Sequence, residues 1–129
     1  MDSISFFKQL IEKFPNSDFC DDALYDIGLC YFHMGQFDKA IEQYRLVIKN
    51  FPNSKINNFN ENIEFGKTSA KCHYSIINCF LALDKIDMAN KELRHLDSFN
   101  NSYLMYGSKK ITFKELAEKL IENYNKLKQ

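Results

Sequence analysis

The chain has 129 residues, of which 45% are hydrophobic and only two are prolines, so it has enough apolar material for one domain with a core. Basic and acidic residues both number 17, and a net charge of zero disfavours nucleic-acid binding, which needs a basic surface. No apolar run is long enough to cross a membrane, so membrane insertion is not expected.

Residues 1–17 are predicted to form one amphipathic helix. Apolar side chains recur at three- and four-residue intervals, the spacing of one helix face, at Phe6, Phe7, Leu10, Ile11 and Phe14. The helix ends at the motif Phe-Pro-Asn-Ser of residues 14–17, which recurs unchanged at residues 51–54. Such a repetition is typical of helical repeat proteins. We therefore predict that residues 1–17 are half of a repeat, without its first helix.

Residues 21–54 are predicted to be one full repeat, a hairpin of two helices. The helical spacing of apolar residues runs through Leu24, Ile27, Gly28 and Tyr31 and then through Ile41, Tyr44, Val47, Ile48 and Phe51. Gly35 suits the left-handed conformation that ends a helix, and Pro52 cannot continue the second helix. The acidic pair Asp21-Asp22 is interpreted as solvated charge at a helix start.

Gly28 lies inside the first helix of this hairpin. A glycine in a helix interior costs about 1 kcal/mol against alanine. We expect that Gly28 offsets this cost by allowing the second helix to approach closely, with Ala40 as its neighbour.

Residues 55–69 are predicted to be an insertion on the surface. Asparagine favours turns because its side chain competes for backbone hydrogen bonds, and four asparagines lie here, at Asn57, Asn58, Asn60 and Asn62. The apolar residues Ile56, Phe59, Ile63 and Phe65 leave two alternatives open, a short docked helical turn or an early extension of the next helix.

Residues 70–103 are predicted to be a second, degenerate repeat. Ala89 matches Ala40, and apolar residues occupy the other corresponding places at Ile76, Ile77, Phe80, Leu93 and Leu96. Because Ile77 stands where the first repeat has its glycine, we expect a looser hairpin.

Residues 112–128 are predicted to be a C-terminal capping helix. Thr112 and Glu115 match a capping box, and one apolar stripe follows at Phe113, Leu116, Ala117, Leu120, Ile121, Tyr124 and Leu127. Lysines and glutamates occupy the opposite side. A terminal helix of this kind covers the apolar side of the last repeat and exposes its other side to water.

The cysteines do not match a disulfide or a zinc site. Cys72 and Cys79 on one predicted helix would lie about 10 Å apart, and a disulfide needs Cα atoms within about 7 Å. No two cysteines have the spacing of paired zinc ligands. We predict buried thiols and no metal or cofactor; a metal held by His73 with Cys72 is the weaker alternative.

No catalytic motif is complete. Gly66-Lys67-Thr68 resembles the end of a phosphate-binding loop, but Glu61 stands where that motif needs its first glycine. The stretch around Ser108 lacks the partner glycine of a nucleophile elbow. Without a coherent set of acid, base and nucleophile, the chain is not expected to be an enzyme.

The pattern of residues 21–54 resembles a tetratricopeptide repeat. With Ala40 at the small helix-packing place of that 34-residue pattern, the other signature places fall on Leu24, Ile27, Gly28, Tyr31, Tyr44, Val47 and Pro52. Leu24 replaces the usual tryptophan, and Val47 replaces the usual alanine. The resemblance implies an all-α fold, a right-handed superhelix of helical hairpins that form an α-α solenoid, in a single domain of residues 1–129.

The resemblance also implies where a partner would bind. In tetratricopeptide domains the concave groove is lined mainly by the first helix of each unit. The lining places fall on Asp22, Tyr25, Leu29 and Phe32 in the first full unit, and on Lys71, Tyr74, Asn78 and Leu81 in the second. Because the helix of residues 21–33 is apolar nearly all round, we expect its second side to be covered. The cover is either the terminal segments of the chain, a second copy, or a ligand.

The leading functional expectation is a non-catalytic scaffold or adaptor whose groove binds a helix or peptide of another protein. The alternative is a structural module that homo-oligomerises through the exposed side of the N-terminal half repeat. Members that bind chaperone C-termini have a lysine and an asparagine where Tyr25 and Leu29 stand, so that activity is not expected.

The step between units also resembles bacterial envelope repeat proteins with a Phe/Tyr-Pro-x-Ser motif, a family involved in outer-membrane assembly and cell-envelope scaffolding. This resemblance covers about half of the chain. Residues 1–4 lack the basic start and apolar stretch of a signal peptide. We therefore expect a cytoplasmic location; a periplasmic location, with a role in envelope assembly, would require that an export signal had been removed.

Overall fold

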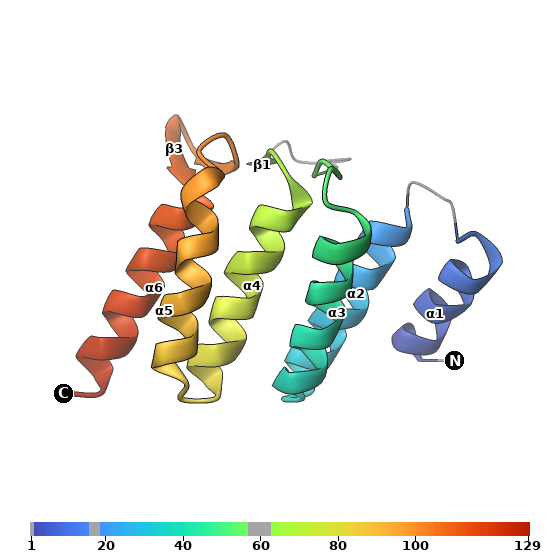
Figure 1. The fold of residues 1–129 in the computed structure, drawn as a ribbon, viewed down its shortest axis with the longest axis horizontal. Helices are drawn as coiled ribbons and strands as arrows, with labels where there is room; N and C mark the ends of the chain where they lie inside the picture. Colours follow the sequence, from blue (N-terminus) through green and yellow to red (C-terminus); the bar gives the residue numbers. More distant parts are fainter. Residues whose placement is uncertain (1, 16–18, 57–62) are drawn as a thin grey trace.

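The computed structural model describes residues 2–15, 19–56 and 63–129. Within these residues lie the helices α1 (Ser3–Lys13), α2 (Cys20–His33), α3 (Phe37–Asn50), α4 (Thr68–Ala82), α5 (Ile86–Arg94) and α6 (Phe113–Leu127), with a short 3-10 helix η1 (His95–Ser98). The helices follow one another in chain order along the long axis of the molecule, from α1 at one end to α6 at the other (Figure 1). The chain is therefore an all-α helical repeat fold; the handedness of its superhelix and the division into units remain predictions.

Helices α2 and α3 form a hairpin, and α2 lies behind α3 in Figure 1. Gly35 in the turn has φ +75°, the left-handed conformation expected of it. The amide of Gln36 donates a 2.8 Å hydrogen bond to the carbonyl of Tyr31, which closes the end of α2. Helix α3 ends at Asn50, two residues before Pro52, as the missing amide hydrogen of proline requires.

The residue nearest to Gly28 is Tyr44 and not Ala40. A Cβ atom on Gly28 would lie 2.6 Å from Cε1 and 2.9 Å from Cδ1 of Tyr44, rather than against Ala40. Tyr44 lies one turn beyond Ala40 on α3, and its long side chain reaches back to α2. The glycine thus makes room for a buried aromatic ring.

The serine of the repeated motif joins three segments of the chain. Ser54 donates a hydrogen bond to the carboxylate of Asp21 at the start of α2, and its carbonyl accepts a 3.0 Å hydrogen bond from the amide of Thr68 at the start of α4. Asp21 is buried, so its interpretation as a solvated charge is wrong. Ser17, the counterpart of Ser54, lies outside the described residues.

A small antiparallel sheet at one end of the helices was not expected from the sequence (Figure 1). Its strands are β1 (Glu64–Phe65), β2 (Tyr103–Tyr106) and β3 (Lys109–Thr112), in the order β1-β2-β3. Glu64 pairs with Leu104, so the segment expected to be an insertion is tied to the segment after the second hairpin. Gly107, at φ +65°, allows the two-residue turn between β2 and β3. The asparagines at 57–62 lie outside the described residues.

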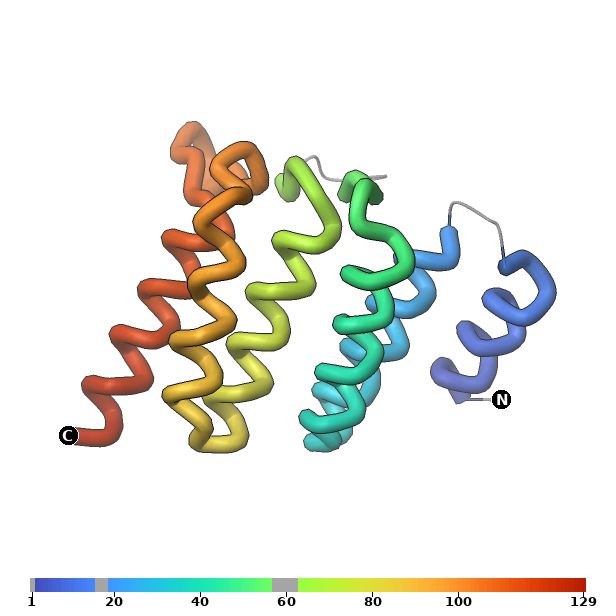
Figure 2. The backbone as a smooth tube through the Cα atoms, viewed as in Figure 1, coloured from blue at the N-terminus to red at the C-terminus, as the bar shows by residue number. Residues whose placement is uncertain are grey.

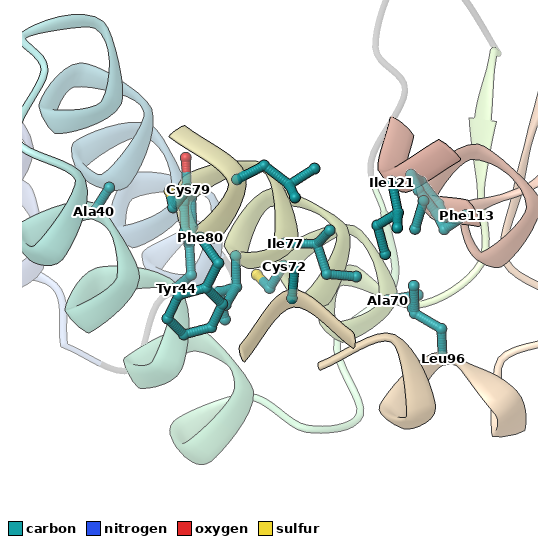
Figure 3. Packing of buried hydrophobic residues seen from close by; sticks show 14 of the residues in the cluster. Ala40, Tyr44, Ala70, Cys72, Ile77, Cys79, Phe80, Leu96, Phe113 and Ile121 are labelled. Carbon is teal, nitrogen blue, oxygen red and sulfur yellow. The ribbon is translucent and has the colours of Figure 1, made fainter. Parts of the chain in front are cut away.

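Helix α4 lies between the α2–α3 hairpin and α5, with α6 beyond, and it contributes more residues to the core than any other described helix (Figures 2 and 3). It begins at Thr68, two residues before the expected start of the second repeat. The buried cluster combines Ala40, Tyr44 and Val47 of α3, Ile76, Ile77, Cys72 and Cys79 of α4, and Phe113, Ala117 and Ile121 of α6. Burial raises the pKa of the Cys72 and Cys79 thiols to about 12, so both are inert packing groups, as predicted.

The expected start of α6 is confirmed. The hydroxyl of Thr112 accepts a 3.1 Å hydrogen bond from the amide of Glu115, and the Glu115 carboxylate accepts a 3.3 Å hydrogen bond from the amide of Thr112. Near the other end of α6, Lys128 forms a 3.0 Å ion pair with Asp84 in the α4–α5 turn. Asp84 has φ +58° and occupies the place that corresponds to Gly35. The role of α6 as a cap remains a prediction.

Candidate partner-binding groove

The residues expected to line the groove lie on α2 and α4, and the structure brings two of them together. The Tyr25 hydroxyl forms a 2.9 Å hydrogen bond with the Ser75 hydroxyl. The Lys71 ammonium lies 4.6 Å from the centre of the Tyr25 ring, a distance that gives a cation–π interaction. The first helices of the two hairpins are therefore neighbours, as the repeat register requires.

Tyr25 is less available to a partner than expected. Its ring also packs on Tyr44, with 5.1 Å between the ring centres. Burial raises the pKa of the Tyr25 hydroxyl well above its ordinary value, so the group stays neutral and acts as a hydrogen-bonding anchor between helices. The cover on this residue comes from the neighbouring helix α4.

Lys71 is held at the edge of this surface by two contacts. Besides the ring of Tyr25, it forms a 2.9 Å ion pair with Glu64 on β1. Sequence reasoning did not find Ser75 or Glu64. Ser75 could have been found, since it lies one helical turn after Lys71; Glu64 carries no local signal, because its place depends on the pairing of β1 with β2.

On α2 the accessible apolar residue of the set is Leu29, with 37% of its surface exposed. Phe32 is half-buried, and its ring packs edge-on against Phe37 with 5.3 Å between the centres. Asp22 is half-buried at the start of the same helix. Of the four expected lining residues on α2, Leu29 is exposed, and Asp22, Tyr25 and Phe32 are half-buried.

On α4 the expected lining residues divide into two kinds. Asn78 is half-buried and polar, and Tyr74 is half-buried against Phe113, with 6.1 Å between the ring centres. Leu81 is buried and belongs to the core, so it offers a partner almost no surface. The face available for binding is therefore narrower than the sequence places suggest, with Leu29 and Asn78 as its most suitable members.

Helix α1 covers a different side of α2. The Cys20 thiol donates a 2.8 Å hydrogen bond to the carbonyl of Phe14, and an apolar cavity of about 290 Å³ lies between the helices, lined by Leu10, Ile11, Phe14, Phe19, Cys20 and Ala23. At 3.6 residues per turn, Cys20 and Ala23 project on the side of α2 opposite to Tyr25 and Leu29. The alternative that the N-terminal half repeat covers the Tyr25 side is therefore wrong.

A partly buried ionic cluster joins α3, α4 and α5. Arg45 donates hydrogen bonds of 2.9 and 2.7 Å to the two carboxylate oxygens of Glu92, and Nδ1 of His73 lies 2.6 Å from the same carboxylate. Burial alone would raise the pKa of Glu92, but the hydrogen bonds from His73 and Arg45 outweigh burial and hold it at about 2. A carboxylate with such a pKa is a weak base, which favours a structural role over a catalytic one.

His73 is thus a partner of Glu92, and its ring stacks on His95 with 5.1 Å between the centres. Among residues 2–15, 19–56 and 63–129, no group of three or more histidine, cysteine, aspartate or glutamate side chains is placed to hold a metal ion. In the same residues, no helix is both long and apolar enough to span a membrane.

Comparison with protein families identifies the first hairpin. The tetratricopeptide repeat family matches residues 22–54, which include nearly all of α2, the whole of α3 and the Pro52 step. No curated protein matches the chain. The matched segment holds the Gly28–Tyr44 contact and the Gly35 turn described above. The chain therefore contains a tetratricopeptide repeat at residues 22–54.

Proposed function

We propose that the protein is a non-catalytic scaffold that binds a helix or peptide of a partner protein along the face formed by α2 and α4. Tetratricopeptide repeats are in general protein-interaction modules, and stacked repeats bind partners through extended surfaces. The observation that supports the proposal most is the exposure of Leu29 on a helix whose other large apolar residues are partly or fully covered.

The chemistry of this face fits an amphipathic partner. Leu29 can bury an apolar side chain of the partner, and the Asn78 amide can donate and accept hydrogen bonds. The Lys71–Glu64 pair lies at the sheet end of the face and supplies charge of both signs. An apolar centre with a polar edge is the usual composition of a protein interface.

Replacing Leu29 with glutamate tests the proposal. A charge placed in an apolar contact should reduce binding of the partner by at least about tenfold, because it must be desolvated without an opposite charge. The partner is first identified by affinity purification with the wild-type chain and mass spectrometry. Its dissociation constant is then measured by titration calorimetry for both chains.

Leu46→Glu is the matched control for this experiment. Leu46 is also a leucine with 37% of its surface exposed, but it lies on α3, outside the expected groove. Circular dichroism should show the same helix content in both variants. Equal binding by Leu29→Glu and wild type, or an equal loss in both variants, would show that the α2–α4 face is not the binding surface.

A second candidate function is self-association through α1. None of the residues of α1 is buried, and Phe6 on this helix is 50% exposed. Phe14 and Phe19, which line the apolar cavity between α1 and α2, are 56% and 59% exposed. Contiguous exposed apolar side chains of this size are typical of protein interfaces. A symmetric pairing of two α1 helices would cover them.

Light scattering tests self-association. The wild-type chain should be dimeric at concentrations of about 0.1 mM, and the double variant Phe6→Ser with Phe14→Ser should be monomeric, because it removes the aromatic contacts. The variant Leu46→Ser with Met88→Ser serves as control, since it removes exposed apolar residues from α3 and α5. A wild-type monomer throughout this range would exclude the second candidate.

A further inference from the structure

A cavity of about 700 Å³ lies at the sheet end of the molecule, separate from the α2–α4 face. Its described lining comes from the segment after α3, the end of β1 with the turn to α4, the end of η1 with the loop to β2, the first residue of β2 and one residue of β3. Lys55, Lys67 and Lys110 line it from three of these segments. None of the described residues that line it is acidic.

The wall of this cavity is aromatic. Side chains alternate between the two faces of a strand, and on β1 Glu64 turns to Lys71, whereas Phe65 stacks on Tyr103 with 5.2 Å between the ring centres. The Lys110 ammonium lies 4.3 Å from the centre of the Tyr103 ring. The strand therefore separates the α2–α4 face from a second surface, which combines an apolar wall with cations.

The backbone fixes the floor of the cavity. Gly66 has φ +104°, and a Cβ atom there would lie 2.5 Å from the Cα atom of Ser102, so only glycine fits. The amide of Lys67 donates a 3.0 Å hydrogen bond to the hydroxyl of Ser102, which is itself buried. The lining segments are thus held together before any ligand arrives, which lowers the entropic cost of binding.

The charged side chains among the described lining residues are all positive. Lys55, Lys67 and Lys110 form no ion pair with any residue of the described part of the chain. The described acidic side chains nearest in the sequence, Glu64 and Asp97, are paired with Lys71 and Lys114. Helix α4 begins at Thr68 and adds the partial positive charge of its amino end. Among the described residues, positive charge is therefore concentrated at this cavity.

We propose that this cavity binds an acidic peptide segment of a partner protein. Its volume falls within the range of about 300–1,000 Å³ that is common for ligand sites. Lysines act as separate point charges rather than as a bidentate fork, which fits several carboxylates along a chain better than one tightly held oxyanion. The Asn100 and Asn101 side chains can bond to a peptide backbone, and the Phe65–Tyr103 wall can take an apolar side chain.

Hexaglutamate is the probe for this site, and binding is measured by titration calorimetry. The triple variant Lys55→Gln, Lys67→Gln, Lys110→Gln should bind it at least about tenfold more weakly, because each exposed charge contributes a factor of a few. Raising the salt concentration from about 0.05 to 0.3 M should also weaken wild-type binding, since screening lengths shorten. Amide shifts of Gly66 and Ser102 in NMR spectra should follow the titration.

The matched control is the triple variant Lys8→Gln, Lys49→Gln, Lys109→Gln. It changes the net charge equally, and Lys109 neighbours Lys110 on β3 but does not line the cavity. Should the first triple variant fold poorly, the single variants Lys110→Gln and Lys109→Gln give the same comparison.

Three results would overturn the proposal: no binding of hexaglutamate, an equal loss in both variants, or lysine-dependent binding of inorganic phosphate without binding of the peptide. The last result would reassign the cavity to a small anion. Because these variants leave Leu29 untouched, the outcome is independent of the proposed groove.

Discussion

Replacement of Glu92 with alanine is expected to lower the free energy of unfolding by about 2–3 kcal/mol, the upper part of the range for hydrogen bonds to charged groups. The Arg45 side chain is 44% exposed and can regain water, so the full cost of breaking a buried ion pair does not apply. The Glu92 side chain is only 4% exposed, and it accepts hydrogen bonds from Arg45 on α3 and has His73 on α4 as its other partner. Without the carboxylate, the guanidinium and the imidazole lose their acceptor inside the protein. The loss of the carboxylate therefore weakens the contact between the α2–α3 hairpin and the α4–α5 hairpin.

Urea unfolding followed by circular dichroism measures this effect. Glu118→Ala is the control, because Glu118 is an exposed glutamate on the helix α6 and should cost less than about 0.5 kcal/mol. A loss below about 1 kcal/mol in Glu92→Ala would show that the cluster does not stabilise the fold.

The same carboxylate should make stability depend on pH. Its pKa in the folded protein is about 2, below the ordinary value of 4.5, so the folded state favours the ionised form. The contribution of Glu92 is then fully present above about pH 5 and is lost as the pH falls from 4.5 toward 2. In Glu92→Gln the decline of stability in this window should be shallower than in wild type. Parallel declines in the two chains would contradict the assignment.

Gly28→Ile is expected to destabilise the fold by about 3 kcal/mol, at the upper end of the cost of overpacking. The first added carbon would lie 2.6 Å from the ring of Tyr44, which is fully buried and is also held by Tyr25. The ring cannot move aside without disturbing the contact between α2 and α4. Urea unfolding measures the loss. Isoleucine has a higher helix propensity than glycine, so helix propensity cannot cause a loss. Leu29→Ile on the same helix is the control for a β-branched residue at an exposed position.

The second hairpin suggests how the overpacking between residues 28 and 44 in Gly28→Ile can be relieved. In the places that correspond to Gly28 and Tyr44 it has Ile77 and Leu93, a larger residue opposite a smaller one. Tyr44→Leu should therefore partly restore the stability of Gly28→Ile, with a coupling energy of about 1–3 kcal/mol in a double-mutant cycle. Additive losses would show that the two residues do not compete for the same space.

The helix ends were predictable from the sequence because short-range chemistry determines them. Gly35 adopts the left-handed conformation, Pro52 follows the end of α3, and Thr112 forms its capping box with Glu115. Each depends on residues within one turn of the chain. The pairing of β1 with β2 was not predictable, since Glu64 and Leu104 lie far apart in the sequence and carry no local pattern. The β2–β3 hairpin was missed, although Gly107-Ser108 is a local signal for a two-residue turn.

The candidate site was predictable only in part. Tyr25 and Lys71, both expected in the groove, lie on neighbouring helices and contact each other, whereas their role in binding stays a prediction. The exposure of these residues was harder to predict, because it depends on how each side chain packs against other helices. Leu81 is buried in the core, whereas Leu29 is exposed. Glu92 was missed because a glutamate on a helix is usually solvated, and its partners come from two other helices.

The sheet changes how the two ends of this molecule can come apart. In a simple solenoid each unit contacts only its neighbours, so either end can unravel first. Here β1 precedes α4 while β2 and β3 precede α6, so the pairing of these strands fastens the start of α6 to the start of α4. Helix α1 has no such fastening to distant segments among the described residues and contributes no buried side chain. Unravelling should therefore begin at α1, while α4, α5 and α6 open together as one cooperative block.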